Sequence, residues 1–162
     1  MFTALSVLRA LIALMDKRTV RFEKRHIAGA ARLEKLCFSE PWSKKSLELL
    51  LSTGAVGFAV EDNGDVVAYG GMLTVLDEGQ VTNVAVDPSC RRKGFGREIV
   101  KALIGFAIEN GIASVSLEVR ESNEAAIALY ESLGFCQRGI RKNFYRNPTE
   151  AAIVMVWEKE RT

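Results

Sequence analysis

Residues Asn83–Val100 read NVAVDPSCRRKGFGREIV and join a strand-like run to a helix-like run. Two glycines, Gly94 and Gly96, flank Phe95 directly before the helical run. Glycines at a strand-to-helix junction let backbone N–H groups point into one space. The first turn of the helix adds its own unpaired donors and the positive end of the helix dipole. The stretch therefore predicts an anion-binding site.

Four cations surround these glycines. They are Arg91, Arg92, Lys93 and Arg97. Such a concentration of positive charge indicates that the anion carries more than one negative charge, as a pyrophosphate does. A basic, solvated loop beside an ordinary helix start is the simpler alternative for the same stretch.

Two other phosphate-binding loops fit this stretch less well. A Walker-type loop is excluded because Gly96 is followed by Arg97 and Glu98 rather than by lysine and then serine or threonine. A dinucleotide fingerprint lacks its third glycine, since Ile99 stands there. Glu118, at the interval of a ribose-binding acid, falls inside its predicted strand rather than at the end.

The composition limits the class of protein. With 162 residues, 48% hydrophobic and 26% charged, the chain is long enough for one domain with one core. The 22 Lys and Arg against 20 Asp and Glu give a net charge of +2, which creates no general attraction to nucleic acid or to an anionic membrane. The cysteines form no CxxC pair and only His26 could assist them, so we expect reduced thiols, no metal site and a cytoplasmic protein. As a separate expectation, the protein is a monomer or a weak dimer.

The N-terminal stretch MFTALSVLRALIAL, residues 1–14, is apolar. It is too short to span a bilayer and is interrupted by Arg9. We expect residues 1–18 to be an N-terminal extension or an extra helix, and residues 19–162 to be a single domain. A signal-like or interfacial helix and a start codon placed too early are the alternatives.

Hydrophobic periodicity and turn residues predict an order of strand, two helices, three meandering strands, helix, strand, helix and two strands. The expected elements are a strand at 20–24, helices at 26–37 and after the N-cap Ser43, a hairpin of 56–62 and 65–75 about Asn63-Gly64, a strand at 80–87 after a Glu78-Gly79 turn, a helix at 96–110, a strand at 114–119, a helix at 123–133, and strands from Phe135 and from Ala152. Strands that first meander and later connect through helices imply a mixed sheet with helices on both faces.

Three segments resemble a known family. Arg91–Gly96 fills the pattern [Q/R]-x-x-G-x-[G/A] of the GNAT acetyltransferases, whose loop holds the pyrophosphate of coenzyme A. Leu117–Phe135, LEVRESNEAAIALYESLGF, and Leu33–Ser43, LEKLCFSEPWS, are similar to the RimI group of that family. Enzymes of this group acetylate the N-terminal alanine of a small-subunit ribosomal protein. The resemblance runs from about Val20 to Trp157.

The resemblance implies an α/β (α+β) GNAT fold with a mixed, mostly antiparallel twisted sheet of about six to seven strands and about four flanking helices. It also implies acetyl-CoA as the cofactor, Glu118 as the general base and Tyr130 as the general acid. The positions it assigns to the cofactor are Val84, Ala85, Val86, Arg91, Arg92, Lys93, Gly94, Phe95, Gly96, Arg97 and Asn123. Taken alone, Glu118 reads as a charge on a solvated strand face, Tyr130 as a core tyrosine and Asn123 as a helix N-cap.

We therefore expect an acetyl-CoA-dependent N-acetyltransferase acting on the N-terminal α-amine of a protein, namely the alanine of a small-subunit ribosomal protein. No cysteine falls in the predicted catalytic stretch, so we expect direct transfer in a ternary complex. The resemblance puts the acceptor between PWSKKS, residues 41–46, and RKNFYRNPTEA, residues 141–151. Another acceptor, such as a lysine side chain or a small-molecule amine, and a non-catalytic acyl-CoA-binding sensor are the alternatives. We expect His26 to be structural.

Overall fold

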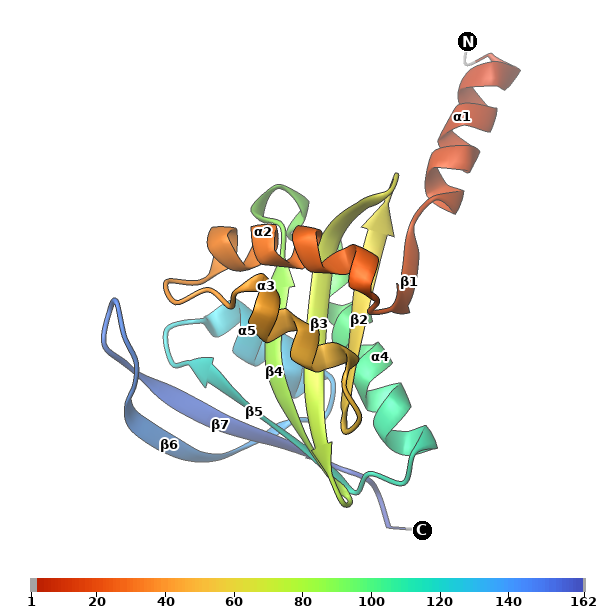
Figure 1. Cartoon of the computed structure of the whole chain (residues 1–162). Coiled ribbons are helices and arrows are strands. Elements are labelled where there is room, and N and C mark those ends of the chain that lie inside the picture. Colours follow the sequence, from red (N-terminus) through yellow and green to blue (C-terminus); the bar gives the residue numbers. More distant parts are fainter. Residues whose placement is uncertain (1–2, 162) are drawn as a thin grey trace.

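The computed structural model describes residues 3–161, and its centre is a seven-stranded sheet in the order β1-β2-β3-β4-β5-β7-β6 (Figure 1). The elements are α1 (Ala4–Met15), β1 (Arg18–Arg21), η1 (Lys24–His26), α2 (Ile27–Cys37), α3 (Lys44–Leu47), η2 (Glu48–Leu51), β2 (Ala55–Asp62), β3 (Asp65–Val75), β4 (Glu78–Val86), η3 (Pro88–Cys90), α4 (Phe95–Glu109), β5 (Ser114–Arg120), α5 (Glu124–Ser132), β6 (Cys136–Tyr145) and β7 (Glu150–Glu158). This arrangement confirms the predicted fold class, and over residues 3–161 α1 brings the number of α-helices to five.

The sheet is interrupted between its fourth and fifth strands. Every neighbouring pair is antiparallel except β4 and β5, which run parallel and pair only over Glu78–Gln80 and Ser114–Ser116. Beyond these residues the two strands separate (Figure 1). We call the unpaired part, residues 81–86 of β4 and 117–120 of β5, the seam. It leaves two strand segments without ladder hydrogen bonds between them.

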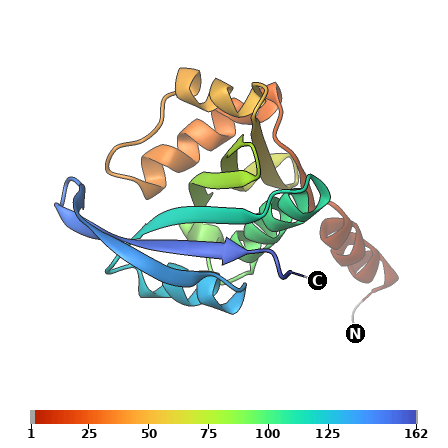
Figure 2. The ribbon, with the colours of Figure 1, turned by 90° about the horizontal axis from the view of Figure 1, so that it is seen from below.

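Helices cover both faces of the sheet (Figure 2). On one side α2 and α3 bury a stripe that includes Leu33 and Leu47 against Tyr69 of β3; we call this the α2 face. On the other, α4 buries a stripe that includes Ile99 and Leu103; this is the α4 face. Burying each such Leu or Ile contributes roughly 1.5–3 kcal/mol. The apolar residues that form these stripes are the ones whose spacing in the sequence predicted α2 and α4.

The helix ends follow their predicted signals. Ser43 caps α3 by accepting a hydrogen bond from Ser46 N at 3.1 Å. Asn123 caps α5 through Oδ1 in the same way. Gly111 (φ 69°) and Gly134 (φ 93°) follow α4 and α5 in the left-handed region that favours glycine.

Two predicted boundaries were wrong. Glu78 and Gly79 lie inside β4 rather than in a turn. The turn lies before Glu78 and includes Leu76, whose φ is 54°. Gly79 is required by packing, since a Cβ there would lie 2.6 Å from the Met72 sulfur. The first strand ends at Arg21, because Glu23 begins a capping box that starts η1.

Helix α1 projects away from the sheet at the N-terminal end of β1 (Figure 1). Its exposed large apolar side chains, each 48–61% accessible, are Leu5, Val7, Leu8, Leu11 and Ile12. Over residues 3–161, no helix has the length and apolar character needed to cross a membrane.

Candidate active site

The β4 side of the seam presents backbone. Asp87 N donates to Val67 O of β3 at 2.8 Å. Because peptide groups alternate in direction along a strand, those of Val84 and Val86 point away from β3, toward the seam. The Val86 carbonyl accepts from the Cys37 thiol at 3.3 Å, whereas the neighbouring Ala85 buries its side chain on the α2 face. The predicted cofactor strand therefore offers main-chain groups where β5 has diverged.

The predicted pyrophosphate loop turns sharply into α4. Arg92 (φ 61°) and Gly94 (φ 82°) both adopt the left-handed conformation, and Phe95 is buried in the core, which fixes the start of the helix. The first three helical N–H groups, from Phe95 to Arg97, have no acceptor within a helix. A Cβ at Gly94 would meet nothing within 4 Å, so this glycine is required by its φ angle and not by lack of space. The geometry fits a cradle for a diphosphate.

The four cations of the loop are exposed but differ in their contacts. Arg97 donates to Ser132 Oγ of α5 at 3.0 Å, and Arg91 reaches the Cys37 sulfur at 3.8 Å. Across residues 3–161, neither Arg92 nor Lys93 makes a side-chain hydrogen bond or an ion pair with another residue. These two charges are the ones that can turn toward a bound anion without first breaking a contact. Asn123 lies at the start of α5 as its N-cap, and its exposed amide nitrogen remains available.

Glu118 stands on the α2 face of β5. Val115, Leu117 and Val119 are buried in the core of the α4 face, so the alternation of the strand directs Glu118 and Arg120 to the other side. The Glu118 side chain is 13% exposed, and its Oε1 lies 3.6 Å from Arg141 Nε. A nearly buried carboxylate at the edge of the seam can accept a proton from a group bound there.

Tyr130 is a buried tyrosine of α5. Its ring packs against Phe135 with centroids 5.7 Å apart, and burial raises its pKa to about 12. Burial likewise raises the pKa of Tyr145 to about 12, with a further contribution from the negative charge of Glu118. Tyr145 also contributes to the raised pKa of Tyr130. Tyr145 thus lies within electrostatic reach of both predicted catalytic residues, a position that its place in the predicted acceptor hairpin only suggested.

Arg120 joins the two segments predicted to border the acceptor, the α2–α3 connection (residues 38–43) and the turn of the β6–β7 hairpin. Its guanidinium lies 4.5 Å from the Tyr145 ring centroid. Its four hydrogen-bond acceptors are Pro148 O (3.0 Å), Arg146 O (3.0 Å), Glu150 Oε1 (3.2 Å) and Ser39 Oγ (3.3 Å). Sequence reasoning missed this residue because its partners are distant along the chain.

A second missed group is centred on Glu34, which is fully buried on α2. Its carboxylate accepts hydrogen bonds from Asn83 Nδ2 at 2.7 Å, from Trp42 N at 2.9 Å and from the Tyr69 hydroxyl. Burial raises the pKa of Glu34, and these three donors oppose that shift. The group links α2, β3, β4 and the α2–α3 connection at one point.

His26 lies away from the seam and is structural, as predicted. It is 1% exposed; Nδ1 accepts from Glu23 N at 2.9 Å, and Nε2 lies 2.8 Å from Glu61 Oε1. The hydrogen bond from His26 and the contact with Arg25 lower the pKa of Glu61. Within the described part of the chain, no group of three His, Cys, Asp or Glu side chains could hold a metal ion.

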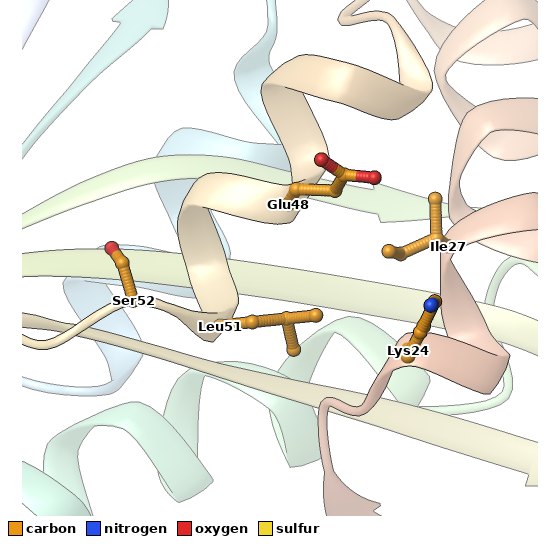
Figure 3. Close-up of a pocket in the computed structure, with 5 residues that line it drawn as sticks. All are labelled: Lys24, Ile27, Glu48, Leu51 and Ser52. Atoms are coloured by element: carbon orange, nitrogen blue, oxygen red, sulfur yellow. The ribbon is translucent and has the colours of Figure 1, made fainter.

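Two surface pockets lie apart from the predicted catalytic residues Glu118 and Tyr130. One, of about 370 Å³, opens between η1–α2 and α3–η2, where Glu48 and Leu51 point toward Ile27 and Lys24 (Figure 3). The other, of about 480 Å³, lies beside the β2–β3 turn and Asp87, whose pKa is lowered to about 2 mainly by a hydrogen bond from Arg32. Neither is lined by Glu118 or Tyr130.

Comparison with known proteins gives a consistent result. The profile of the Acetyltransferase (GNAT) family matches residues 27–135. The [ribosomal protein bS18]-alanine N-acetyltransferase of Escherichia coli K12 is 40% identical over 137 residues, which cover 82% of this chain and 91% of that protein.

Two solved structures extend the comparison. The crystal structure of the ribosomal-protein-S18-alanine N-acetyltransferase from Escherichia coli superposes with a TM-score of 0.83 at 36% identity, covering 90% of this chain and 96% of that one. A chain of the NatC complex bound to Gag peptide and CoA superposes with a TM-score of 0.79 at 20% identity, covering 90% and 100%, which shows a shared fold.

Proposed function

Because this chain belongs to the acetyltransferase (GNAT) family, we propose that it transfers an acetyl group from acetyl-CoA to the N-terminal alanine of ribosomal protein bS18. The observation that carries the proposal is the 40% identity, over 82% of the chain, to the Escherichia coli enzyme of that name. The position of Glu118 at the seam supports the same chemistry. We expect the protein to act in the cytoplasm, on the protein N-terminus of its acceptor.

The residues present fit coenzyme A. Acetyl-CoA supplies the acetyl group as a thioester. The main chain of Val84–Val86 would contact its pantetheine arm, and the Arg91–Arg97 loop with the first turn of α4 would hold its pyrophosphate. Arg92 and Lys93 are the loop cations free to add ionic contacts, and Asn123 could contribute its amide nitrogen from the start of α5. An N–H of the seam would stabilise the negative charge that develops on the thioester oxygen.

The amine must be neutral to react, because an ammonium has no lone pair. An N-terminal amine has a pKa of about 7.7–8.0, so deprotonating it near neutral pH costs on the order of 1 kcal/mol. Glu118 accepts this proton, directly or through one water. The nitrogen lone pair forms the new N–C bond as the C–S bond breaks.

Tyr130 supplies a proton to the departing sulfur. Its pKa of about 12 keeps the phenol protonated at every pH at which the amine is neutral and the enzyme active. Two protons leave the nitrogen on the way from ammonium to amide: Glu118 takes the first, and the second passes to water after the N–C bond has formed. Tyr130 gives one proton to the sulfur and regains it from water, and Glu118 passes its proton to water, so the reaction releases one proton overall. The raised pKa keeps Tyr130 in the protonated form that an acid requires, and it also makes the phenol a weaker acid.

A coupled thiol-release assay tests the proposal. We expect acetyl-CoA to release thiol in the presence of a hexapeptide that begins with alanine, and not in the presence of the same peptide acetylated at its N-terminus. Release with both peptides when the hexapeptide contains lysine would assign the activity to a side-chain amine. Thermal stabilisation by acetyl-CoA without release on any amine would overturn the enzymatic function and leave an acyl-CoA-binding sensor.

A further inference from the structure

The Glu34 carboxylate is buried with donors and no counter-charge. It is 0% exposed, and over residues 3–161 no Lys, Arg or His forms an ion pair with it. Its three partners are the Trp42 main-chain N–H, the Asn83 amide and the Tyr69 hydroxyl. An ionised carboxylate only accepts hydrogen bonds, and all three partners donate to it. A carboxylate that only accepts hydrogen bonds therefore fixes which atom of each partner faces it.

Of the three partners, Asn83 is the one whose side-chain orientation matters for the proposed reaction. Its Nδ2 faces Glu34 at 2.7 Å, so its Oδ1 faces the other way. No donor among residues 3–161 is hydrogen-bonded to this oxygen, and Asn83 is only half-buried. The oxygen is therefore a free acceptor on β4.

Alternation along β4 places Asn83 on the α2 face, because Ala85 packs there and Val84 packs on the α4 face. The register of β3 and β4 shifts between Gly70 and Met72, so β4 has one residue more than β3 over this stretch. Thr82 and Asn83 then both point to the α2 face: a Cβ at Gly71 would meet Leu50 and Thr82 Oγ1 together. The bulge lies in the β4 part of the seam, and Glu118 lies in the β5 part.

We propose that Glu34 is a positioning residue that holds the Asn83 amide with its oxygen toward the seam, where that oxygen accepts an N–H of the acceptor's α-amine. The inference rests on the proposed function and adds a second contact for the amine. The amine donates one N–H to Asn83 and gives one proton to Glu118, so a group on each of the two strands contacts the nitrogen. The Trp42 bond sets the α2–α3 connection, one wall of the acceptor side, from the same carboxylate.

The test uses Glu34→Gln. The Trp42 N–H cannot reverse its role, so the Gln oxygen must turn to it and the Gln amide nitrogen must face Tyr69 and Asn83. A hydroxyl and an amide can both reverse, so the variant can fold, but Asn83 then presents its NH₂ group to the seam. We expect the KM for an alanine-initiated hexapeptide to rise roughly ten- to a hundredfold, with the Kd for acetyl-CoA within about twofold. Asn83→Ala should raise the peptide KM by a similar factor.

Tyr69→Phe is the matched control. It removes another donor to the same Glu34 oxygen while leaving Asn83 in place, so its peptide KM should stay within about twofold of the parent. The side-chain ¹⁵N–¹H signals of Asn83 give a readout independent of turnover, and we expect Glu34→Gln, but not Tyr69→Phe, to shift them. Equal KM increases in Glu34→Gln and Tyr69→Phe would show a merely structural effect and overturn the proposal.

The outcomes separate this inference from the proposed function. A parent enzyme that transfers no acetyl group to the alanine hexapeptide overturns the function itself. An active parent whose Asn83→Ala variant keeps the parental peptide KM overturns only the role of Asn83 and Glu34.

Discussion

The two sides of the seam differ in the groups that form them, main-chain groups on one side and side chains on the other. The proposed cofactor side is main chain: the peptide groups of Val84 and Val86 and the first turn of α4 after Gly94. The proposed acceptor side consists of side chains held by long-range contacts, with Arg120 and Glu34 as the two centres. A main-chain site tolerates many side chains but few changes in backbone angle, whereas a side-chain network depends on each member. Substitutions on the two sides should therefore fail in different ways.

The largest expected effect is at Glu118, between the two sides. We expect Glu118→Gln to lower kcat/KM for the alanine hexapeptide by about 10² to 10⁴ near pH 7, because the amine loses its base. The deficit should shrink above about pH 9, where an amine of pKa about 7.7–8.0 is already neutral. A pH–rate profile of both proteins measures this, with the exposed neighbour Glu121→Gln as the control. A deficit that does not change with pH would exclude Glu118 as the base.

Tyr130→Phe tests the acid. We expect kcat to fall roughly ten- to a hundredfold with an unchanged Kd for acetyl-CoA. A phenol with a pKa of about 12 is half ionised only near pH 12, whereas an ordinary tyrosine is half ionised near pH 10. The parent's kcat should accordingly show no alkaline fall up to about pH 10. A fall centred on pH 9 that disappears in Tyr130→Phe would contradict this account.

Gly94→Ala tests the main-chain side. Alanine at φ 82° is strained, so we expect a loss of stability of roughly 1–2 kcal/mol and a five- to tenfold weaker Kd for acetyl-CoA, with the peptide KM unchanged. Gly105→Ala is the control, since it lies within α4 and a Cβ there meets nothing within 4 Å. It should be neutral or stabilise the helix. Calorimetric titration with acetyl-CoA and thermal unfolding decide the outcome.

Arg120→Gln tests the side-chain network and has the smallest expected effect on turnover. The variant loses the Arg120 bonds to Ser39 and to the hairpin turn but keeps the direct bond from Ser39 Oγ to Arg146 O at 3.0 Å, so the peptide KM should rise about three- to fivefold and the Kd for acetyl-CoA should stay unchanged. Arg138→Gln on the same hairpin removes only the exposed pair with Glu158 and should change neither value. If Arg120→Gln weakened acetyl-CoA binding as much as peptide binding, the division between the two sides would not hold.

The same division explains what the sequence could predict. The strand, loop and helix of the cofactor side are contiguous, so Gly94, the basic loop and the apolar stripe of α4 were readable together. The hairpin about Asn63-Gly64 and the caps at Ser43 and Asn123 were also local signals, and the structure has them as predicted.

Non-local features escaped prediction. Glu34 meets Tyr69 and Asn83, which lie 35 and 49 residues away, and nothing in its own neighbourhood marks it as more than a polar residue on a helix. Gly79 was read as a turn because glycine serves both turns and close packing, and only the Met72 contact distinguishes them. The predicted roles of Glu118, Tyr130 and the loop residues stay predictions until the substitutions above are measured.

The short pairing of β4 with β5 also affects the mechanics of the whole molecule. Within residues 3–161, three residue pairs are the only ladder contact between β4 and β5, so the four N-terminal strands and the three C-terminal strands are weakly connected. A ligand lying in the seam would bridge that connection and resist its opening. At a hundred times its Kd such a ligand stabilises the fold by about 2.7 kcal/mol. Heat resistance would then follow the supply of acyl donor, and amide exchange at Val84 and Val86 would slow as that supply rises.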